Sequence, residues 1–268
     1  MNSGVGPLGN RLSLRRDPLR LALSGSPWRS ACFLAVYVFA TGWLLFAAAF
    51  TTAVTAAGFA VTLAGIPLLA AAAGVLRGCA NVERVRLRQV LAEPVRGGYR
   101  PVTRPGILAQ ASTRWRDPAT WRDLAYLVGL WAPLFALDTA VLTVWLVFLA
   151  GITTPAWYWA VRHTSPIGYS NGQSVHGLVL GYFPHGPHGA GAWGFYVDTL
   201  PKALLLAAVC LVLFLLFNYV LVATARAHAS AARALLRAPA DPLAEAKDIL
   251  ARPGPIPPLQ TTRRPGRA

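Results

Sequence analysis

Long uncharged stretches alternate with short arginine-rich segments along this chain. No charged residue lies between Arg29 and Arg77. A single helix over that stretch would be about 70 Å long, more than twice the thickness of a bilayer's hydrocarbon core. We therefore predict that the stretch folds back on itself at the polar break Thr51–Gly58.

Four apolar segments are each long enough to cross a bilayer. The composition agrees, because 55% of the 268 residues are hydrophobic and 13% are charged, which leaves too little polar surface for an ordinary soluble domain. We predict an all-α, polytopic membrane protein with four transmembrane helices, at about residues 31–50, 56–76, 124–150 and 203–225.

The segments around these spans complete the predicted organisation. Residues 1–30 form a cytoplasmic N-terminal segment, and residues 31–238 form the four-span domain with an outer loop at about 151–199. Residues 239–268 are rich in proline and arginine, so we expect a largely disordered cytoplasmic tail.

The charge distribution indicates the direction in which the chain crosses the membrane. The sequence has 25 Lys and Arg against 10 Asp and Glu, a net charge of +15. All of these cations except Arg162 and Lys202 fall on one side of the predicted spans. By the positive-inside rule we expect a multi-pass protein of the inner, cytoplasmic membrane with both termini in the cytoplasm. The partner of the basic residues is then the lipid bilayer and not nucleic acid, because no folded basic domain is indicated.

The predicted spans form a two-plus-two repeat. Ser26-Pro27-Trp28-Arg29 precedes the first span, and Asp117-Pro118 with Trp121-Arg122 precedes the third. Each entry supplies a helix N-cap, a proline at the first helical position and a Trp/Arg pair suited to the headgroup layer.

The segments that follow the second and fourth spans also match each other in their arginine spacing. Coincidence in an arginine-rich cytoplasmic sequence is the alternative explanation. Both exits have arginines at i, i+7 and i+11, which places three guanidinium groups along one stripe of a helix. We predict that these helices relay a signal and hold lipid phosphates. Glu83 lies in the apolar arc of the first helix, and the pattern does not explain it. The arginines are Arg77, Arg84 and Arg88, then Arg226, Arg233 and Arg237.

Several blocks together resemble a known family. They are Gly65–Leu69 (GIPLL), Val82–Arg86 (VERVR), Arg116–Leu127 (RDPATWRDLAYL) and Ala156–Trp159 (AWYW). In this order they resemble the four-helix "putative sensor" domain at the N-terminus of many actinobacterial two-component histidine kinases. The resemblance runs from about Arg16 to Arg237.

The resemblance implies a sensor module without catalytic activity of its own. In kinases of this family the last span leads into a dimerisation helix and an ATP-binding domain, whereas 31 residues follow Arg237 here. We therefore expect the output to come from a protein partner in trans, a kinase or regulator, and a homodimer is a further expectation. His228 lies too close to the fourth span to be a phosphoacceptor.

Asp138 is the main candidate for chemistry within the membrane. It lies about 22 Å along the third span, where an ionised carboxylate costs several kcal/mol unless it is paired, hydrated or protonated. Asp138 can be a protonated side chain whose hydrogen bonds hold neighbouring helices together, or it can take part in signal or proton coupling. Asn218 of the fourth span is the second candidate for signal coupling and a candidate hydrogen-bond partner of Asp138. The other candidate partners are Tyr219, Tyr37, Thr41 or a water.

Four of the five histidines lie in the outer loop: His163, His176, His185 and His188. Histidine changes charge near neutral pH and binds Zn, Cu or Ni, so this concentration permits a pH or metal sensor. The glycines and prolines between them favour instead a solvated or partner-facing loop, and we predict neither a metal site nor a cofactor.

Catalytic motifs are missing from the sequence. It has no GxSxG elbow, no GxxxxGK[ST] phosphate loop, no GxGxxG after a strand and no HExxH. Two alternatives to a sensor remain open. One is a small transporter or channel component that uses Asp138, and the other is a membrane adaptor that recruits a partner through its tail.

Overall fold

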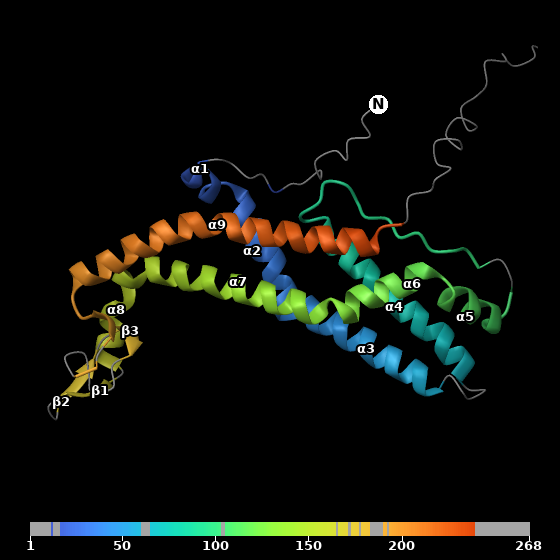
Figure 1. Ribbon diagram of the computed structural model, residues 1–268, viewed down its shortest axis with the longest axis horizontal. Coiled ribbons are helices and arrows are strands. Elements are labelled where there is room, and N and C mark those ends of the chain that lie inside the picture. Colours follow the sequence, from blue (N-terminus) through green and yellow to red (C-terminus); the bar gives the residue numbers. More distant parts are fainter. Residues whose placement is uncertain are drawn as a thin grey trace, which may run out of the picture. The chain divides into compact units, whose positions relative to one another are not determined.

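The computed structural model describes residues 12, 17–59, 65–102, 105–164, 166–170, 173–176, 178–182, 190–191 and 193–238. Most of them are helical, so the prediction of a mainly helical fold is confirmed (Figure 1). The predicted tail, residues 239–268, lies outside the described residues.

The first half of the chain forms a helical hairpin with short helices after it. The two arms are the continuous run α2–η1–α3 and the helix α4, and α3 packs against α4. The bounds are α1 Pro18–Ala22, α2 Gly25–Val36, η1 Tyr37–Thr41, α3 Gly42–Phe59, α4 Gly65–Leu87, α5 Ile107–Trp115 and α6 Pro118–Leu124.

The turn of this hairpin comes later than we predicted. The helix continues through Thr51–Gly58 to Phe59, so the predicted break there is wrong. Thr51 donates its hydroxyl hydrogen to the carbonyl of Ala47, and Thr55 donates to that of Thr51, each at 2.6 Å. Threonines that satisfy their hydroxyls inside the helix do not interrupt it.

The two span entries differ in how well the sequence predicts them. Asp117 caps α6 as expected, its Oδ1 accepting from the amide of Ala119 at 3.1 Å, with Pro118 as the first helical residue. At the other entry the N-cap is Ser24 and not Ser26. The Ser24 side chain accepts a hydrogen bond from the amide of Ser26.

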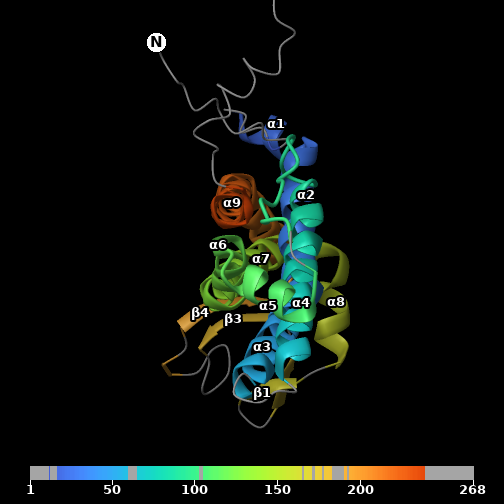
Figure 2. The same ribbon diagram turned by 90° about the vertical axis from the view of Figure 1, so that its right-hand side faces the viewer.

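The second half is built on two long antiparallel helices. These are α7 (Trp131–Ile152) and α9 (Leu200–Leu236), preceded by the π-helical turn η2 (Ala125–Gly129). They run side by side in Figure 1 and remain adjacent in Figure 2. Three contacts set their register: Asp138 with His228, Trp145 with Asn218, and Gly151 with Cys210.

The segment between α7 and α9 is more ordered than the predicted loop. It contains a helix and two antiparallel β-hairpins, which corrects the all-α fold class. Residues of high β-propensity, such as Val179, Tyr196 and Val197, explain the second hairpin. The bounds are α8 Thr154–Thr164, β1 Pro166–Ser170, β2 Gln173–His176, β3 Leu178–Tyr182 and β4 Trp193–Val197.

Three helical segments among the described residues are long and apolar enough to cross a membrane. They are Gly25–Gly58, Trp131–Ile152 and Leu200–Leu236. The helix α4, which overlaps our predicted second span, is not among them. Its second half carries four charged residues: Arg77, Glu83, Arg84 and Arg86.

Candidate functional site

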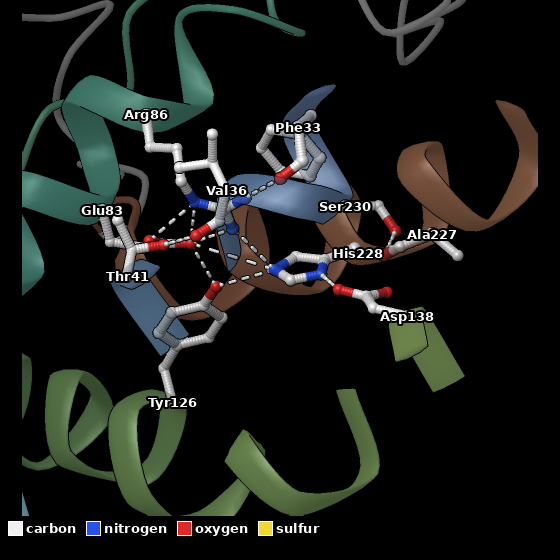
Figure 3. A network of polar contacts seen from close by, with 10 residues as sticks. All are labelled: Phe33, Val36, Thr41, Glu83, Arg86, Tyr126, Asp138, Ala227, His228 and Ser230. Carbon is white, nitrogen blue, oxygen red and sulfur yellow. Dashed lines mark hydrogen bonds and ion pairs between the residues drawn. The ribbon is translucent and has the colours of Figure 1, made fainter. Parts of the chain in front are cut away.

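A buried polar cluster joins helices that are distant in the sequence. It contains His228 of α9, Asp138 of α7, Tyr126 of η2, and Glu83 with Arg86 of α4 (Figure 3). The backbone of α2 adds the carbonyl of Phe33. His228, Glu83 and Asp138 have no exposed surface, and Tyr126 and Arg86 are also buried. Five helical elements therefore meet at one set of hydrogen bonds.

His228 lies at the centre of the cluster. Its Nδ1 is 2.6 Å from Oδ2 of Asp138, and its Nε2 is 2.9 Å from Nη2 of Arg86 and 3.1 Å from the Tyr126 hydroxyl. A guanidinium can only donate hydrogen bonds, so Nε2 is the acceptor and Nδ1 carries the proton. His228 is then neutral and donates to the Asp138 carboxylate.

Arg86 is satisfied at every nitrogen. Its Nε donates to the Glu83 carboxylate at 2.9 and 3.0 Å, and its Nη1 donates to the Phe33 carbonyl at 2.8 Å. Its Nη2 donates to both Glu83 and His228. The guanidinium also lies 3.9 Å from the centre of the Phe33 ring and 4.9 Å from that of Tyr37, which adds cation–π attraction.

Glu83 is held as a carboxylate by these donors. Burial by itself would raise its pKa, but the charge of Arg86 and the hydrogen bonds from Arg86 and Tyr126 outweigh burial and lower the pKa to about 2. The Tyr126 hydroxyl donates to Glu83 Oε1 at 2.7 Å. For Arg86 burial acts to lower the pKa, yet Glu83 reverses that effect and the pKa of the guanidinium is raised.

Both tyrosines beside His228 lie in π-helical turns. Tyr37 begins η1 and Tyr126 is in η2. The Tyr37 and His228 rings pack edge to face, with 4.6 Å between their centroids. A π-turn redirects the side chains around it and is frequent at functional sites. The turn at η1 also requires Gly42, because a Cβ there would lie 2.5 Å from the Tyr37 carbonyl oxygen.

A second polar cluster lies between α4, α6 and the segment that follows α4. Arg77 donates to Asp117 at 2.9 Å, and Arg84 donates to Asp123 at 2.8 Å. The Tyr99 hydroxyl donates to Asp123 at 2.6 Å and accepts from Arg84 at 2.6 Å. Burial, followed by the bond to Asp123, raises the pKa of Tyr99 to about 12, and burial raises the pKa of Asp123. This cluster fixes α6, and hence the start of α7, against α4.

A comparison with known protein families matches residues 33–236 to the family described as "Putative sensor". The chain belongs to this family. The family resemblance seen in the sequence is thereby confirmed. No curated protein and no solved structure matches the chain.

The structure places Asp138 and Asn218 in two separate contacts. Asp138 contacts His228, a residue that was not among the partners we considered for it. Asn218 instead accepts a hydrogen bond from Trp145 Nε1 at 3.0 Å. His228, which lies too close to the predicted fourth span to be a phosphoacceptor, is on the same helix as Asn218 and about three turns beyond it.

The six arginines at the predicted span exits do not form the two matching stripes that we predicted. Arg77 and Arg84 are held in the second polar cluster, and Arg84 is buried, so the prediction that it faces lipid phosphates is wrong. Arg226 donates to the Leu12 carbonyl, and Arg233 lies 3.4 Å from Glu93. Arg88 and Arg237 are exposed.

The four histidines of the predicted outer loop are described only in part. His163 lies in α8 and His176 in β2, while His185 and His188 lie outside the described residues. Within the part of the chain that is described, no group of three or more His, Cys, Asp or Glu could hold a metal ion.

Glu83, which the apolar pattern left unexplained, is an essential part of the first cluster. Arg86 lies three residues later, and the two form an ion pair within one helix. A charged pair at i and i+3 inside an apolar arc is the signal that would have indicated a buried polar cluster.

Proposed function

We propose that this chain is a non-catalytic membrane sensor module that relays the state of its outer segment to the cytoplasmic side through α9. The observation that carries the proposal is the continuity of α9, a single helix of 37 residues. A helix of that length spans about 55 Å, against about 30 Å for a bilayer's hydrocarbon core. It packs against α8 and β4 near its start and contributes His228 to the buried cluster near its end.

The register of α7 and α9 supports a coupled movement. Gly151 and Cys210 meet near the outer end, Trp145 and Asn218 in the middle, and Asp138 and His228 toward the cytoplasmic end. A displacement at the first contact changes the alignment at the third, because packed helices shift as rigid bodies.

In this proposal the buried polar cluster around His228 is the part of the protein that switches between two states, one with its hydrogen bonds formed and one with them broken. Its hydrogen bonds are formed only when α2, α4, η2, α7 and α9 are all in register. A buried polar network that is half satisfied is costly, so intermediate positions of α9 are disfavoured. Movement of α9 therefore releases or restores the cluster as a unit.

We further propose the four-span, two-plus-two arrangement in the cell membrane with both termini cytoplasmic. The first half of α4 is apolar and would serve as the second span, while its charged second half would emerge on the cytoplasmic side. The basic residues near the ends of α4 and α9 agree with the positive-inside rule.

The output of such a module requires another component. The resemblance to sensor domains of histidine kinases favours a kinase or regulator, and a homodimer fits the same comparison. A tail-mediated adaptor would also bind a partner, but it would not depend on movement of α9.

A transporter that uses Asp138 is a second candidate, favoured by the Asp138–His228 pair as a possible proton carrier. Flux in proteoliposomes that Asp138→Asn abolishes would support transport. A sensor instead predicts no flux.

The relay is tested with a bulky substitution that separates α7 from α9 at the outer end of α9. The readout is the distance between two spin labels at the cytoplasmic end. Spin labels at the exposed positions Val85 of α4 and Ser230 of α9 report the cytoplasmic end. Gly151→Leu pushes α7 away from α9, because even a Cβ there would lie 2.3 Å from Cys210 Sγ. We expect the label distance in lipid nanodiscs to shift by about 1–2 Å or its distribution to broaden.

The matched control is Ala208→Leu, which adds volume to an exposed position of α9. It should leave the label distance as in the unmodified protein. An unchanged distance in Gly151→Leu would show that the outer end of α9 does not communicate with the cytoplasmic end and would contradict the relay.

A further inference from the structure

An apolar pocket of about 190 Å³ lies where α7, α8, β3 and α9 meet. Val147, Ala150 and Gly151 of α7 line one side, and Leu206 and Cys210 of α9 line another. Trp157 of α8 and Leu178 and Leu180 of β3 complete it. The pocket is thus built by both long helices together with the outer segment.

The lining rejects polar ligands. Its one hydroxyl belongs to Thr154, which is buried and already donates to the Ala150 carbonyl at 3.4 Å. A ligand with polar groups would find no partner in the pocket and would lose its hydrogen bonds to water. Apolar cavities of about 150 Å³ stay dry and bind molecules such as benzene, so this pocket has room for a short run of methylene groups.

The pocket is open on the side where the helices face their surroundings. Val147 is 58% exposed and Leu180 is 44% exposed, and Ala150 between them in the lining is also exposed. Val147 and Ala150 belong to a helix that is long and apolar enough to cross the membrane, so the surface next to the pocket is a surface for lipid. The pocket continues that surface inward.

Trp157 indicates the depth of the pocket in the bilayer. Its indole nitrogen donates to the hydroxyl of Thr153, at the junction of α7 and α8, at 3.1 Å. Tryptophan with an apolar body and a polar tip is typical of the membrane–water interface. The pocket therefore lies just below the outer headgroups, where the upper part of an acyl chain is found.

We propose that this pocket binds an acyl chain of a bilayer phospholipid, inserted between α8, β3 and the α7–α9 pair. Its lining includes Gly151 and Cys210, the outermost of the three contacts that set the register of α7 and α9. The inference depends on the membrane location of the chain and not on the relay, so either can fail without the other.

Photo-crosslinking tests the proposal directly. The full chain is reconstituted in phosphatidylcholine nanodiscs that contain a phosphatidylcholine with a diazirine in its acyl chain. After irradiation, modified peptides are identified by mass spectrometry. We expect the lipid on the pocket residues of α7, α8 and α9 at a yield several-fold above that on lipid-facing positions around Leu213 and Leu216, which are 40% and 56% exposed.

Two variants keep the test specific. Ala150→Phe fills the pocket and should reduce the yield at the pocket at least fivefold. Ala208→Phe adds the same side chain at an exposed position outside the pocket and should leave the yield unchanged. Equal yields at the pocket and at Leu213 and Leu216, or an equal loss in both variants, would overturn the proposal. Labelling by free diazirine palmitate added from water, without labelling by the phospholipid, would overturn the bilayer as the source.

Discussion

His228 donates its Nδ1 hydrogen to the Asp138 carboxylate across 2.6 Å, although the two residues lie 90 positions apart in the chain. Neither side chain has exposed surface. The contact joins α7 to α9 beyond the point where Trp145 meets Asn218, and it connects the α7–α9 pair to the Glu83–Arg86 ion pair. We expect the stability of the cluster to depend on the two residues together.

A double-mutant cycle with Asp138→Asn and His228→Gln measures this dependence. Each single variant should insert and fold but lose stability, because each leaves a buried partner poorly satisfied. The coupling energy should be about 1–3 kcal/mol, in the range for residues in direct contact. Free energies of unfolding in detergent micelles provide the measurement, and losses that simply add would show that the contact is not formed.

Removing the charge of Glu83 should be more damaging. Glu83→Gln leaves Arg86 buried without a counter-ion, and breaking a buried pair in this way costs about 3–5 kcal/mol. The control is Glu93→Gln, at a carboxylate that is 76% exposed and weakly paired with Arg233. It should change the free energy of unfolding by less than about 0.5 kcal/mol. Similar effects of the two variants would contradict the buried ion pair.

The pH dependence of stability follows from the lowered pKa of Glu83. A carboxyl whose folded pKa is about 2, against an ordinary value of 4.5, stabilises the fold above pH 4.5 and loses that contribution as pH falls through 2. The difference in Tm between the unmodified protein and Glu83→Gln should be constant from pH 5 upward and shrink below about 4.5. A difference that grows as the pH falls would show the wrong sign and refute the assignment.

The π-turn at η1 predicts an intolerant glycine. Gly42→Ala would place a Cβ 2.5 Å from the Tyr37 carbonyl oxygen and should cost about 1–3 kcal/mol, since the backbone must shift. Gly78→Ala in α4 has no atom within 4 Å of the new Cβ and should be neutral or stabilising by about 0.5–1 kcal/mol. Thermal unfolding of the two variants compares them, and equal stability would mean that η1 is not under steric constraint.

Features encoded by neighbouring residues could be predicted from the sequence. The apolar helices, the family and the Asp117 cap all depend on local patterns, and the structure or the family comparison supports each. The β-hairpins of the outer segment were missed because glycines and prolines between short strands also occur in irregular loops. The turn placed at Thr51–Gly58 was wrong because threonines within an apolar helix bond to its own backbone.

The site could be predicted only in part. Asp138 was identified by its depth in an apolar span, but its partner depends on the register between α7 and α9, which periodicity does not encode. Arg84 looked like a headgroup ligand because its partner Asp123 lies 39 residues away. Glu83 and His228 each look anomalous alone, and only the packing of α4 against α9 shows that they belong to one cluster.

The orientation of the chain in the membrane underlies all of these proposals, and thiol labelling of intact cells measures it. In a background without the three native cysteines, Ala190→Cys in the outer segment and Val102→Cys after α4 report the two sides. A membrane-impermeant maleimide should label Ala190→Cys in intact cells and Val102→Cys only after lysis. Labelling of Val102→Cys in intact cells, with Ala190→Cys protected, would place the Glu83–Arg86–His228 cluster at the outer face and contradict the proposed direction of signalling.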